Sequence, residues 1–196
     1  MLKFNVLFIG GICIGAKTSL IHRIVYNKYL YDEISINATN NYENKRVLTP
    51  YGEVYLKLYD TAGQERYRSI TKSFYKFSNC IIIGYSINSR NSFELVSELY
   101  YSIIENIGNS ALIYLVANQI DNKENEKVTE EEGRQIAQQF NIKFFQVSAK
   151  TGEGVDELVN DIANTLALTK QKGENKNNNL TIEKQKNKKK KGDCLK

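Results

Sequence analysis

Apolar runs and alternating patterns divide most of the chain into strands and helices. The segment Leu2–Ile9 is short and nearly continuously apolar, as expected for a strand that is covered on both faces of a sheet. The segment Cys80–Tyr85 has the same character, whereas Val54, Leu56 and Leu58 alternate with other residues and indicate a strand with one apolar face. Six strands are therefore expected, over residues 2–9, 42–48, 53–59, 80–85, 111–117 and 143–147.

Between these strands, apolar residues recur at the spacing of one face of a helix. Helices are expected over residues 18–26, 91–107, about 130–140 and 155–168. Thr129 and Glu132 have the spacing of a capping box and mark the start of the third of these helices. Strands that alternate with helices predict an α/β domain with a mainly parallel sheet, whose ligand sites lie at the carboxyl ends of the strands.

Composition separates the chain into a globular part and a tail. The chain has 196 residues, of which 41% are hydrophobic, and this is enough for one domain with a substantial core. Residues 170–196 contain ten lysines and three acidic residues, whereas the preceding part is nearly neutral, with 17 basic and 19 acidic residues. We therefore expect a globular domain over residues 1–168 and a disordered basic tail over residues 169–196.

The cysteines and the apolar segments bear on the compartment. Cys13, Cys80 and Cys194 are scattered and odd in number, which argues against a disulfide framework and favours a reducing compartment. Residues 4–16 follow Lys3 and could serve as the apolar core of a signal peptide, but they also provide the first strand that the later motifs need. Because no run of about 18 or more apolar residues occurs, we expect no membrane span.

The segment Gly10–Leu20 has the composition of a phosphate-binding loop. A connection that contains glycines and joins a strand to a helix ends in Lys17 and Thr18. Backbone N–H groups and the start of the helix would face an anion, the lysine would add a positive charge, and the threonine hydroxyl could ligate Mg2+. A plain glycine-rich turn remains the alternative interpretation.

A second polar segment, Asp60-Thr61-Ala62-Gly63-Gln64-Glu65, directly follows a predicted strand. It places a carboxylate and an amide at the mouth of a site, where Asp60 suits a metal ion and Gln64 suits the orientation of a water molecule. A polar loop without chemistry is the alternative. Two further segments, Asn118-Gln119-Ile120-Asp121 and Ser148-Ala149-Lys150, also follow predicted strands.

These four segments resemble, in their order along the chain, the motifs of Ras-superfamily small GTPases, and the extension from Glu65 to Thr71 resembles the Rab branch. The resemblance covers roughly residues 3–168. It implies a three-layer P-loop GTPase domain with a six-stranded, mainly parallel sheet. It also implies a GTP/GDP-dependent switch in intracellular vesicle trafficking, which hydrolyses GTP slowly unless an activating protein assists.

On the phosphate side, the resemblance assigns Lys17 to the β- and γ-phosphates and both Thr18 and Asp60 to Mg2+. Gln64 would orient the attacking water as the catalytic residue, and the N–H group of Gly63 would sense the γ-phosphate. The other phosphate-loop residues that it assigns to nucleotide binding are Gly15, Ala16 and Ser19.

On the base side, the resemblance assigns guanine recognition to Asn118 and Asp121, the carboxylate accepting from the ring N–H group and the exocyclic amine. The N–H group of Ala149 would meet the guanine O6 atom. Tyr29 lies where relatives place an aromatic ring against the base, although an ordinary loop aromatic is an equal alternative. The remaining residues assigned to this side are Ser148 and Lys150.

Departures from the family pattern leave a second function open. Counting back from Lys17 puts Ala16 where a glycine is expected, and a positive φ there would cost about 1–2 kcal/mol. Counting forward from Gly10 instead makes the loop one residue too long. Residues 30–41 correspond by position to the first switch, where relatives carry a threonine that binds Mg2+ and senses the γ-phosphate. That position falls on Ile36 or Asn37, depending on the direction of counting.

Gln119 replaces a family lysine that packs against the base and braces the phosphate loop. Because Ala16, Ile36 and Gln119 alter different parts of the site, a degenerate pseudo-GTPase that acts as a protein-binding scaffold is the alternative function. His22, the only histidine, is interpreted as structural or surface.

The resemblance also implies partners: effector proteins, an exchange factor and a GTPase-activating protein, all bound through the switch regions. The helix of the second switch, expected over residues 66–77, contains Phe74 and Tyr75, whose exposure would suit a partner surface. We expect a monomer in the cytoplasm.

The tail offers a contact to anionic membranes. It holds six lysines between residues 184 and 191, which would be attracted to an anionic membrane surface. Cys194 has only two residues after it, so it does not form a CaaX box, and its lipidation stays open. Peripheral association with intracellular membranes is therefore expected through charge. The tail lacks interleaved aromatic residues, so no nucleic-acid partner is expected.

Overall fold

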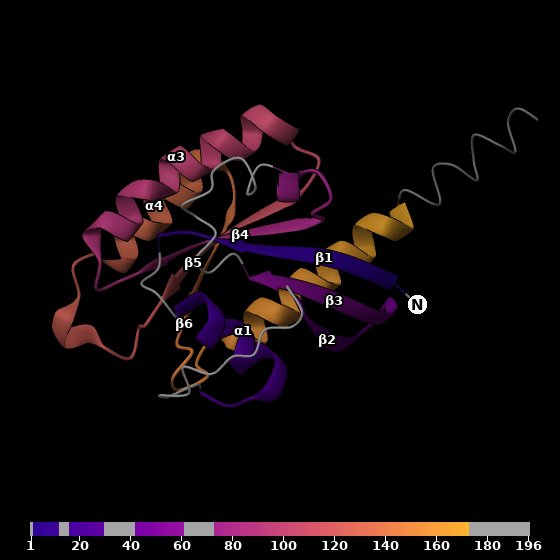
Figure 1. Ribbon diagram of the computed structural model, residues 1–196, viewed down its shortest axis with the longest axis horizontal. Coiled ribbons are helices and arrows are strands. Elements are labelled where there is room, and N and C mark those ends of the chain that lie inside the picture. Colours follow the sequence, from indigo (N-terminus) through magenta and orange to yellow (C-terminus); the bar gives the residue numbers. More distant parts are fainter. Residues whose placement is uncertain (1, 12–15, 30–41, 61–72, 173–196) are drawn as a thin grey trace, which may run out of the picture.

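The computed structural model describes residues 2–11, 16–29, 42–60 and 73–172, and these form one sheet with helices on both faces (Figure 1). The six strands run across the sheet in the order β2-β3-β1-β4-β5-β6. Their bounds are Leu2–Ile9 for β1, Tyr42–Thr49 for β2, Gly52–Asp60 for β3, Cys80–Ser86 for β4, Leu112–Asn118 for β5 and Lys143–Val147 for β6.

The sheet is parallel apart from one strand. β1 pairs in parallel with β3 and β4, β4 with β5, and β5 with β6, whereas β2 pairs antiparallel with β3. This architecture confirms the predicted α/β fold with a six-stranded, mainly parallel sheet. Leu2–Ile9 lies in the middle of the sheet, which accounts for its hydrophobic character because both of its faces are covered.

Two helical layers cover the two faces of the sheet (Figure 1). α3 (Arg90–Ile107) and α4 (Glu130–Phe140) pack on one face, over a core that includes Leu7, Ile81 and Leu115. α1 (Ala16–Tyr26) and a C-terminal helix over residues 155–172 pack on the other face, over Val6, Ile82 and Val116. A short 3-10 helix, η1 (Lys123–Asn125), follows β5. None of the helices within the described ranges is both long and apolar enough to cross a bilayer.

The start of α4 confirms the predicted capping box. The Thr129 hydroxyl accepts from the N–H group of Glu132, and the Glu132 carboxylate accepts in return from the N–H group of Thr129. Two backbone donors at this helix end are thereby satisfied. The helix ends at Phe140, and the next residue, Asn141, adopts the left-handed conformation typical of a helix C-terminus.

The C-terminal helix corrects one predicted boundary. We expected it to end near Leu168, with a disordered tail from Thr169, but residues 169–172 continue the helix. The Thr169 hydroxyl donates to the backbone carbonyl of Thr165 at 2.8 Å, a bond within one helical turn that polar residues can make without an apolar face to pack. The lysine-rich residues 173–196 lie outside the described part of the chain, and their disorder stays a prediction.

The parallel register brings the predicted motifs to one edge of the sheet. Asp60, at the end of β3, stands opposite Phe8 near the end of β1, and Asn118, at the end of β5, stands opposite Ser86 at the end of β4. β6 ends at Val147, which is opposite Asn118. The loops that follow β1, β3, β5 and β6 therefore start at the same edge of the sheet, as expected for ligand sites in parallel sheets.

Candidate functional site

Gly10 and Gly11 let the chain leave β1 against its neighbours. Gly10 has a φ of +142°, and a Cβ atom there would lie 2.0 Å from the carbonyl oxygen of Gly84 on β4. A Cβ atom on Gly11 would lie 2.7 Å from the Leu95 side chain of α3. Close packing against backbone therefore requires a glycine at position 10, whereas at position 11 the Leu95 side chain would have to move. Residues 12–15, including the predicted Gly15, lie outside the described part.

Lys17 lies in the first turn of α1 and is only 3% exposed. Its ammonium group donates to the carbonyl oxygen of Gly10 at 3.1 Å, across the start of the loop that the two residues enclose. A buried ammonium needs such partners because desolvation penalises its charge. The lysine is therefore held at the mouth of the phosphate loop, where the sequence predicts phosphates. Ser19, also predicted to bind nucleotide, is buried in the same helix.

Thr18 and Asp60 come together although they are far apart in the sequence. The Thr18 hydroxyl, on α1, donates to the Asp60 carboxylate, at the end of β3, over 2.5 Å. Both groups are oxygen ligands, which suit Mg2+, and this ion is commonly bound by one or two carboxylates together with substrate phosphates. The described residues hold no cluster of three or more histidine, cysteine or acidic side chains for a metal. The donor set therefore fits a site that a nucleotide would complete.

Ala16 does not have the positive φ that would have strained it. It is the first residue of α1, and the only non-glycine residues with a positive φ in the described ranges are Asn27, Gln119 and Asn141. The cost of about 1–2 kcal/mol for a left-handed alanine therefore does not arise at this position. The other departures in the phosphate half, Ile36 or Asn37, lie outside the described part, as do Gly63 and Gln64.

Asn118 joins the phosphate loop to the base-side loops. Its side chain is fully buried, and its amide nitrogen lies 3.4 Å from the carbonyl oxygen of Ala16, to which it donates. Its amide oxygen accepts from the N–H groups of Gln119 at 2.8 Å and Ala149 at 3.3 Å. One side chain thereby braces three segments, as a buried amide must if its donors and acceptors are to be satisfied.

Within the described residues, the Gln119 side chain does not brace the phosphate loop, whereas the lysine at this position does so in relatives. Its backbone is left-handed, with a φ of 69°, and its side-chain oxygen accepts a short hydrogen bond from the Ser86 hydroxyl at the end of β4. Ser86 is itself fixed, because its N–H group donates to the Ser92 hydroxyl at the start of α3. The amide therefore ties the loop after β5 to β4, and the bond from Asn118 to Ala16 provides a brace to the phosphate loop.

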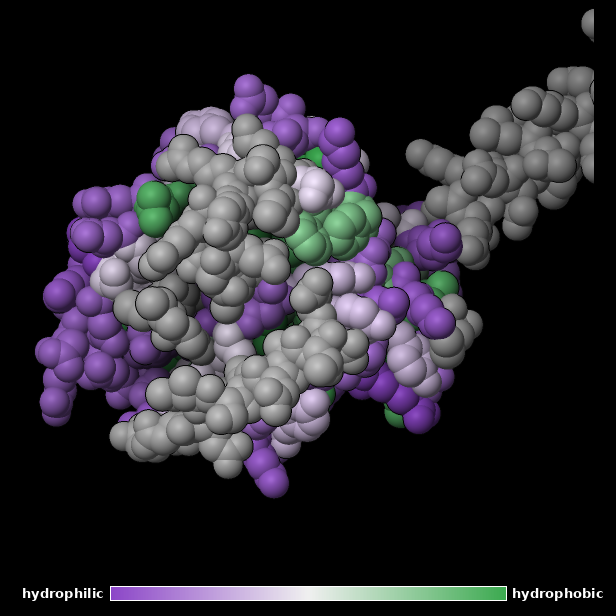
Figure 2. All heavy atoms as spheres, viewed as in Figure 1, coloured by the Kyte–Doolittle hydropathy of each residue, from purple (hydrophilic) through white to green (hydrophobic). Residues whose placement is uncertain are grey.

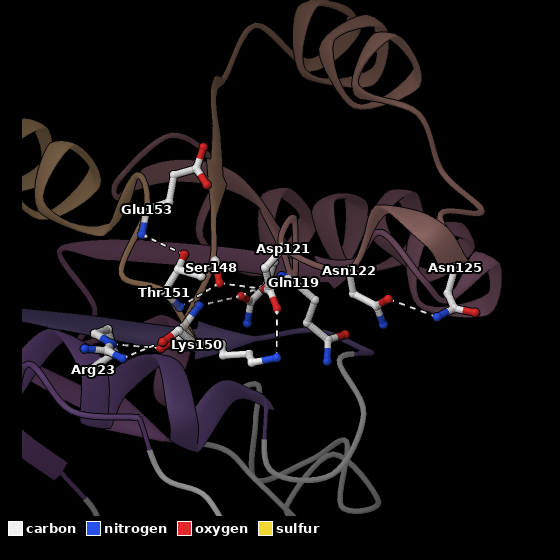
Figure 3. Close-up of polar contacts among 11 residues, drawn as sticks. Arg23, Gln119, Asp121, Asn122, Asn125, Ser148, Lys150, Thr151 and Glu153 are labelled. Atoms are coloured by element: carbon white, nitrogen blue, oxygen red, sulfur yellow. Dashed lines mark hydrogen bonds and ion pairs between the residues drawn. The ribbon is translucent and has the colours of Figure 1, made fainter.

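Asp121 is oriented by the loop that follows β6 (Figure 3). The Ser148 hydroxyl donates to one Asp121 carboxylate oxygen at 2.6 Å and accepts from the N–H group of Thr151 at 3.0 Å. The Lys150 ammonium lies 4.0 Å from the other carboxylate oxygen. The carboxylate predicted to read guanine is thus held by a hydroxyl and faced by a positive charge.

Arg23 is a member of this site that the sequence did not reveal. From the last turn of α1, its guanidinium donates to the carbonyl oxygens of Ala149 at 2.8 Å and Lys150 at 2.6 Å (Figure 3). Nothing in the local pattern distinguishes it from any basic residue at the end of a helix, where the dipole favours positive charge. Ser86 was missed for the same reason, since its partner lies 33 residues away.

The residues that directly precede the predicted first switch are held by contacts with α1. His22 donates from Nδ1 to the carbonyl oxygen of Lys28 at 2.9 Å, and its ring packs on Tyr26 with centroids 4.7 Å apart. These contacts agree with a structural interpretation of this histidine. Tyr29 follows directly and is 37% exposed. Its stacking on a base stays a prediction.

Aromatic side chains gather beside the second switch. The Tyr59 ring contacts the rings of Tyr42, Phe74 and Phe77, and Phe74 contacts Phe77, with centroid distances of 5.1–6.2 Å. Figure 2 shows a pale green patch on this face, near the helical turn at residues 73–75. Tyr75 corrects a prediction, because it is only 2% exposed and packs into the core beneath α3, where burial raises its pKa. Phe77, at 41% exposure, takes the exposed position instead.

The fold and the arrangement of these loops are those of a small GTPase, and sequence comparison agrees. The model of the Ras family matches residues 5–168, so the chain belongs to the Ras family. Within this family it is Rab-like. It is 29% identical, over 162 residues, to the Ras-related protein SEC4 of Candida albicans and to the same protein from strains WO-1 and SC5314. The match covers 83% of this chain and 76% of each relative. Ras-family GTPases in general bind GTP and GDP with Mg2+ and hydrolyse GTP.

Proposed function

We propose that the protein is a Rab-like GTP/GDP-dependent switch that hydrolyses GTP and acts in intracellular vesicle trafficking. The observation that carries the proposal is the hydrogen bond of the Thr18 hydroxyl to the Asp60 carboxylate. It brings two Mg2+-type ligands together beside the buried Lys17, at the same sheet edge that carries the base-side loops.

In the phosphate half, Lys17 would exchange the carbonyl oxygen of Gly10 for phosphate oxygens, which are stronger acceptors for an ammonium group. Thr18 and Asp60 would hold Mg2+ between them and the nucleotide. When bound, this ion neutralises charge that develops on the phosphate oxygens. Ala16 starts the helix whose N-terminal N–H groups face the anion, and its helical backbone is compatible with that role.

In the base half, Asp121 would accept hydrogen bonds from the guanine ring N–H group and exocyclic amine. The Ser148 hydroxyl donates to one carboxylate oxygen, which orients the group before the base arrives. The N–H group of Ala149 would turn from the Asn118 amide oxygen, 3.3 Å away, to the guanine O6 atom. Tyr29 would cover one face of the base.

Hydrolysis would be slow in the isolated protein. Gln64 would orient the attacking water, and a GTPase-activating protein that supplies an arginine would raise the rate by about 10³–10⁵. The cluster of aromatic side chains formed by Tyr42, Tyr59, Phe74 and Phe77 would be part of the surface that binds effectors. An exchange factor would also bind at the switches. The lysine-rich tail would hold the protein on anionic intracellular membranes from the cytoplasm.

A second candidate function is a protein-binding scaffold that does not switch. The observation that favours it is the hydrogen bond between Gln119 and Ser86, because it turns the residue that replaces the family lysine toward β4. The base-side loops are also held by the protein's own hydrogen bonds. Such a scaffold would bind partners through the cluster of aromatic side chains, whether or not a nucleotide is present.

Titration of the purified, nucleotide-stripped protein with fluorescent GDP and GTP analogues, with and without Mg2+, separates the two functions. The switch predicts tight binding of both nucleotides that weakens when Mg2+ is removed, and a Thr18→Ala variant that loses this dependence. Single-turnover hydrolysis, with Gln64→Leu as the slow control, then tests the enzyme. Absent binding, or binding indifferent to Mg2+ and to the γ-phosphate, would leave the scaffold.

A further inference from the structure

Arg23 connects the helix of the phosphate half to the loop of the base half. Its Nε and Nη2 atoms donate to the consecutive carbonyl oxygens of Ala149 and Lys150, at 2.8 and 2.6 Å. A guanidinium is planar and always charged, so two donors in a fixed geometry hold two carbonyls at once. A lysine, with its single nitrogen, could not hold both with the same geometry.

The peptide unit between Lys150 and Thr151 links the contact made by Arg23 to Asp121. In a trans peptide the carbonyl oxygen and the following N–H group point in opposite directions. The carbonyl of Lys150, held by Arg23, therefore fixes the direction of the N–H group of Thr151. That N–H group donates to the Ser148 hydroxyl at 3.0 Å, and the hydroxyl donates to Asp121 at 2.6 Å (Figure 3).

Arg23 also holds the other side of the base half. Its Nη1 atom donates to the carbonyl oxygen of Asn27 at 2.8 Å, while the N–H group of Asn27 donates back to the carbonyl oxygen of Arg23 at 2.9 Å. Asn27 adopts a left-handed conformation, with a φ of 54°, where α1 ends and the segment toward Tyr29 begins. One guanidinium thus fastens the two chain segments predicted to flank the base.

We propose that Arg23 is a positioning residue for guanine recognition, which sets the Asp121 carboxylate through the Lys150–Thr151 peptide and the Ser148 hydroxyl. This inference rests on the proposed nucleotide site. Arg23 itself need not touch the base. Its removal should leave the Asp121 carboxylate less well oriented, so that the exocyclic amine of guanine contributes less to binding.

The test compares GDP with inosine diphosphate, which lacks only that exocyclic amine, by equilibrium titration of the full chain. The Arg23→Met variant is expected to bind GDP more weakly and to lose about three- to tenfold of the preference for GDP over inosine diphosphate, the scale of one weakened charged hydrogen bond. The matched control is Arg134→Met, on the exposed side of α4, which should keep both affinities and their ratio.

A double substitution tests the route through Ser148. Ser148→Ala alone should lower the same preference, and Arg23→Met added to it should lower the preference no further. Independent, multiplying effects would overturn the route. Arg23→Lys serves where the methionine variant folds poorly. It keeps the charge and can reach one carbonyl, so an intermediate preference is expected.

A nucleotide-free measurement keeps this inference separate from the proposed function. Trypsin cleavage after Lys150, followed by mass spectrometry, should be faster in Arg23→Met than in the wild type and in Arg134→Met, because the loop opens more often. An unchanged cleavage rate and an unchanged nucleotide preference would overturn the role of Arg23. If the wild type binds neither nucleotide, the proposed function fails and with it the part in recognition, while the cleavage rates still decide whether Arg23 holds the loop.

Discussion

At the base end of the site, the loops after β5 and β6 form hydrogen bonds with one another and with α1. At the phosphate end, Lys17 and Thr18 form hydrogen bonds that a nucleotide and its metal ion would replace. Ser148 and Arg23 satisfy Asp121 and the Ala149–Lys150 backbone from within the protein. Lys17 instead donates to the carbonyl oxygen of Gly10, and Thr18 donates to Asp60, the other predicted Mg2+ ligand.

In the proposed nucleotide site, this difference would separate affinity from base preference. A base has a fixed shape and few polar atoms, so a loop that is already oriented recognises it with little loss of entropy. Phosphates and Mg2+ bring strong charges that compensate for the exchange of existing hydrogen bonds. On this account, affinity arises mainly at the phosphate end and base preference at the other end.

Lys17→Met should have the largest effect and tests the phosphate end. It removes a buried charge that would contact more than one phosphate oxygen, so the affinity for GDP should fall about 1,000-fold. The measurement is equilibrium titration with a fluorescent GDP analogue. Lys143→Met, whose ammonium pairs with Asp161 at the other side of the fold, is the control and should leave the affinity unchanged. A similar loss in both variants would contradict the assignment.

Asp121→Asn tests the base end. The amide would offer a donor where the exocyclic amine needs an acceptor, so GDP should bind about 100-fold more weakly while xanthosine diphosphate, which has a carbonyl there, should bind better. Competition titration of the two nucleotides measures the change. Glu124→Gln, on the neighbouring η1, is the control. Equal weakening of both nucleotides would place Asp121 outside the base contact.

Asn118→Ala should loosen the connection between the two ends. It leaves the carbonyl of Ala16 and the N–H groups of Gln119 and Ala149 without this partner in a fully buried position. The nucleotide-free protein should lose about 2 kcal/mol of stability, the scale of a buried unsatisfied polar group. Urea unfolding followed by circular dichroism measures this loss. No change would mean that the two ends are braced elsewhere.

Arg90→Met should have the smallest effect and lies outside both ends. Arg90 donates to Glu132 at 2.7 Å, and this bond, together with hydrogen bonds from Thr129, lowers the pKa of that carboxyl to about 2, from an ordinary value of 4.5. A lowered folded-state pKa adds stability above about pH 4.5, which is lost as the pH falls toward 2. The variant should therefore be less stable than the wild type at pH 7 and nearly equal near pH 2.

Urea midpoints at both pH values measure the contribution of Arg90. Its side chain is 41% exposed, and GDP affinity at pH 7 should not change. A loss of GDP affinity in Arg90→Met would mean that Arg90 contributes to the site. A stability difference that persists near pH 2 would contradict the ion pair as its cause.

The sequence predicted the sheet well because strand hydrophobicity follows from burial. β1 and β6 begin and end where the apolar pattern places them, and the capping box at Thr129 uses residues only three positions apart. The ligand-type side chains Thr18 and Asp60 were predicted as a pair through motif resemblance, and the parallel register then brings them into contact. Their roles in binding stay predictions.

Other features depend on contacts between distant parts of the chain. Arg23 reaches residues more than 120 positions away, and the Gln119–Ser86 bond joins two strand ends, so no local pattern indicates either. Tyr75 was expected on the surface because it falls in the predicted helix of the second switch, but packing beneath α3 buries it. The backbone of Ala16 likewise depends on where α1 starts.

Hydrogen–deuterium exchange on the nucleotide-stripped protein, before and after addition of GDP and Mg2+, tests the division between the ends most directly. We predict that the segments after β5 and β6 are already protected without nucleotide and gain little, whereas the segments that contain Lys17, Thr18 and Asp60 gain strong protection. Equal gains at both ends would contradict a preformed base site. No gain at either end would contradict the nucleotide site itself and favour the scaffold.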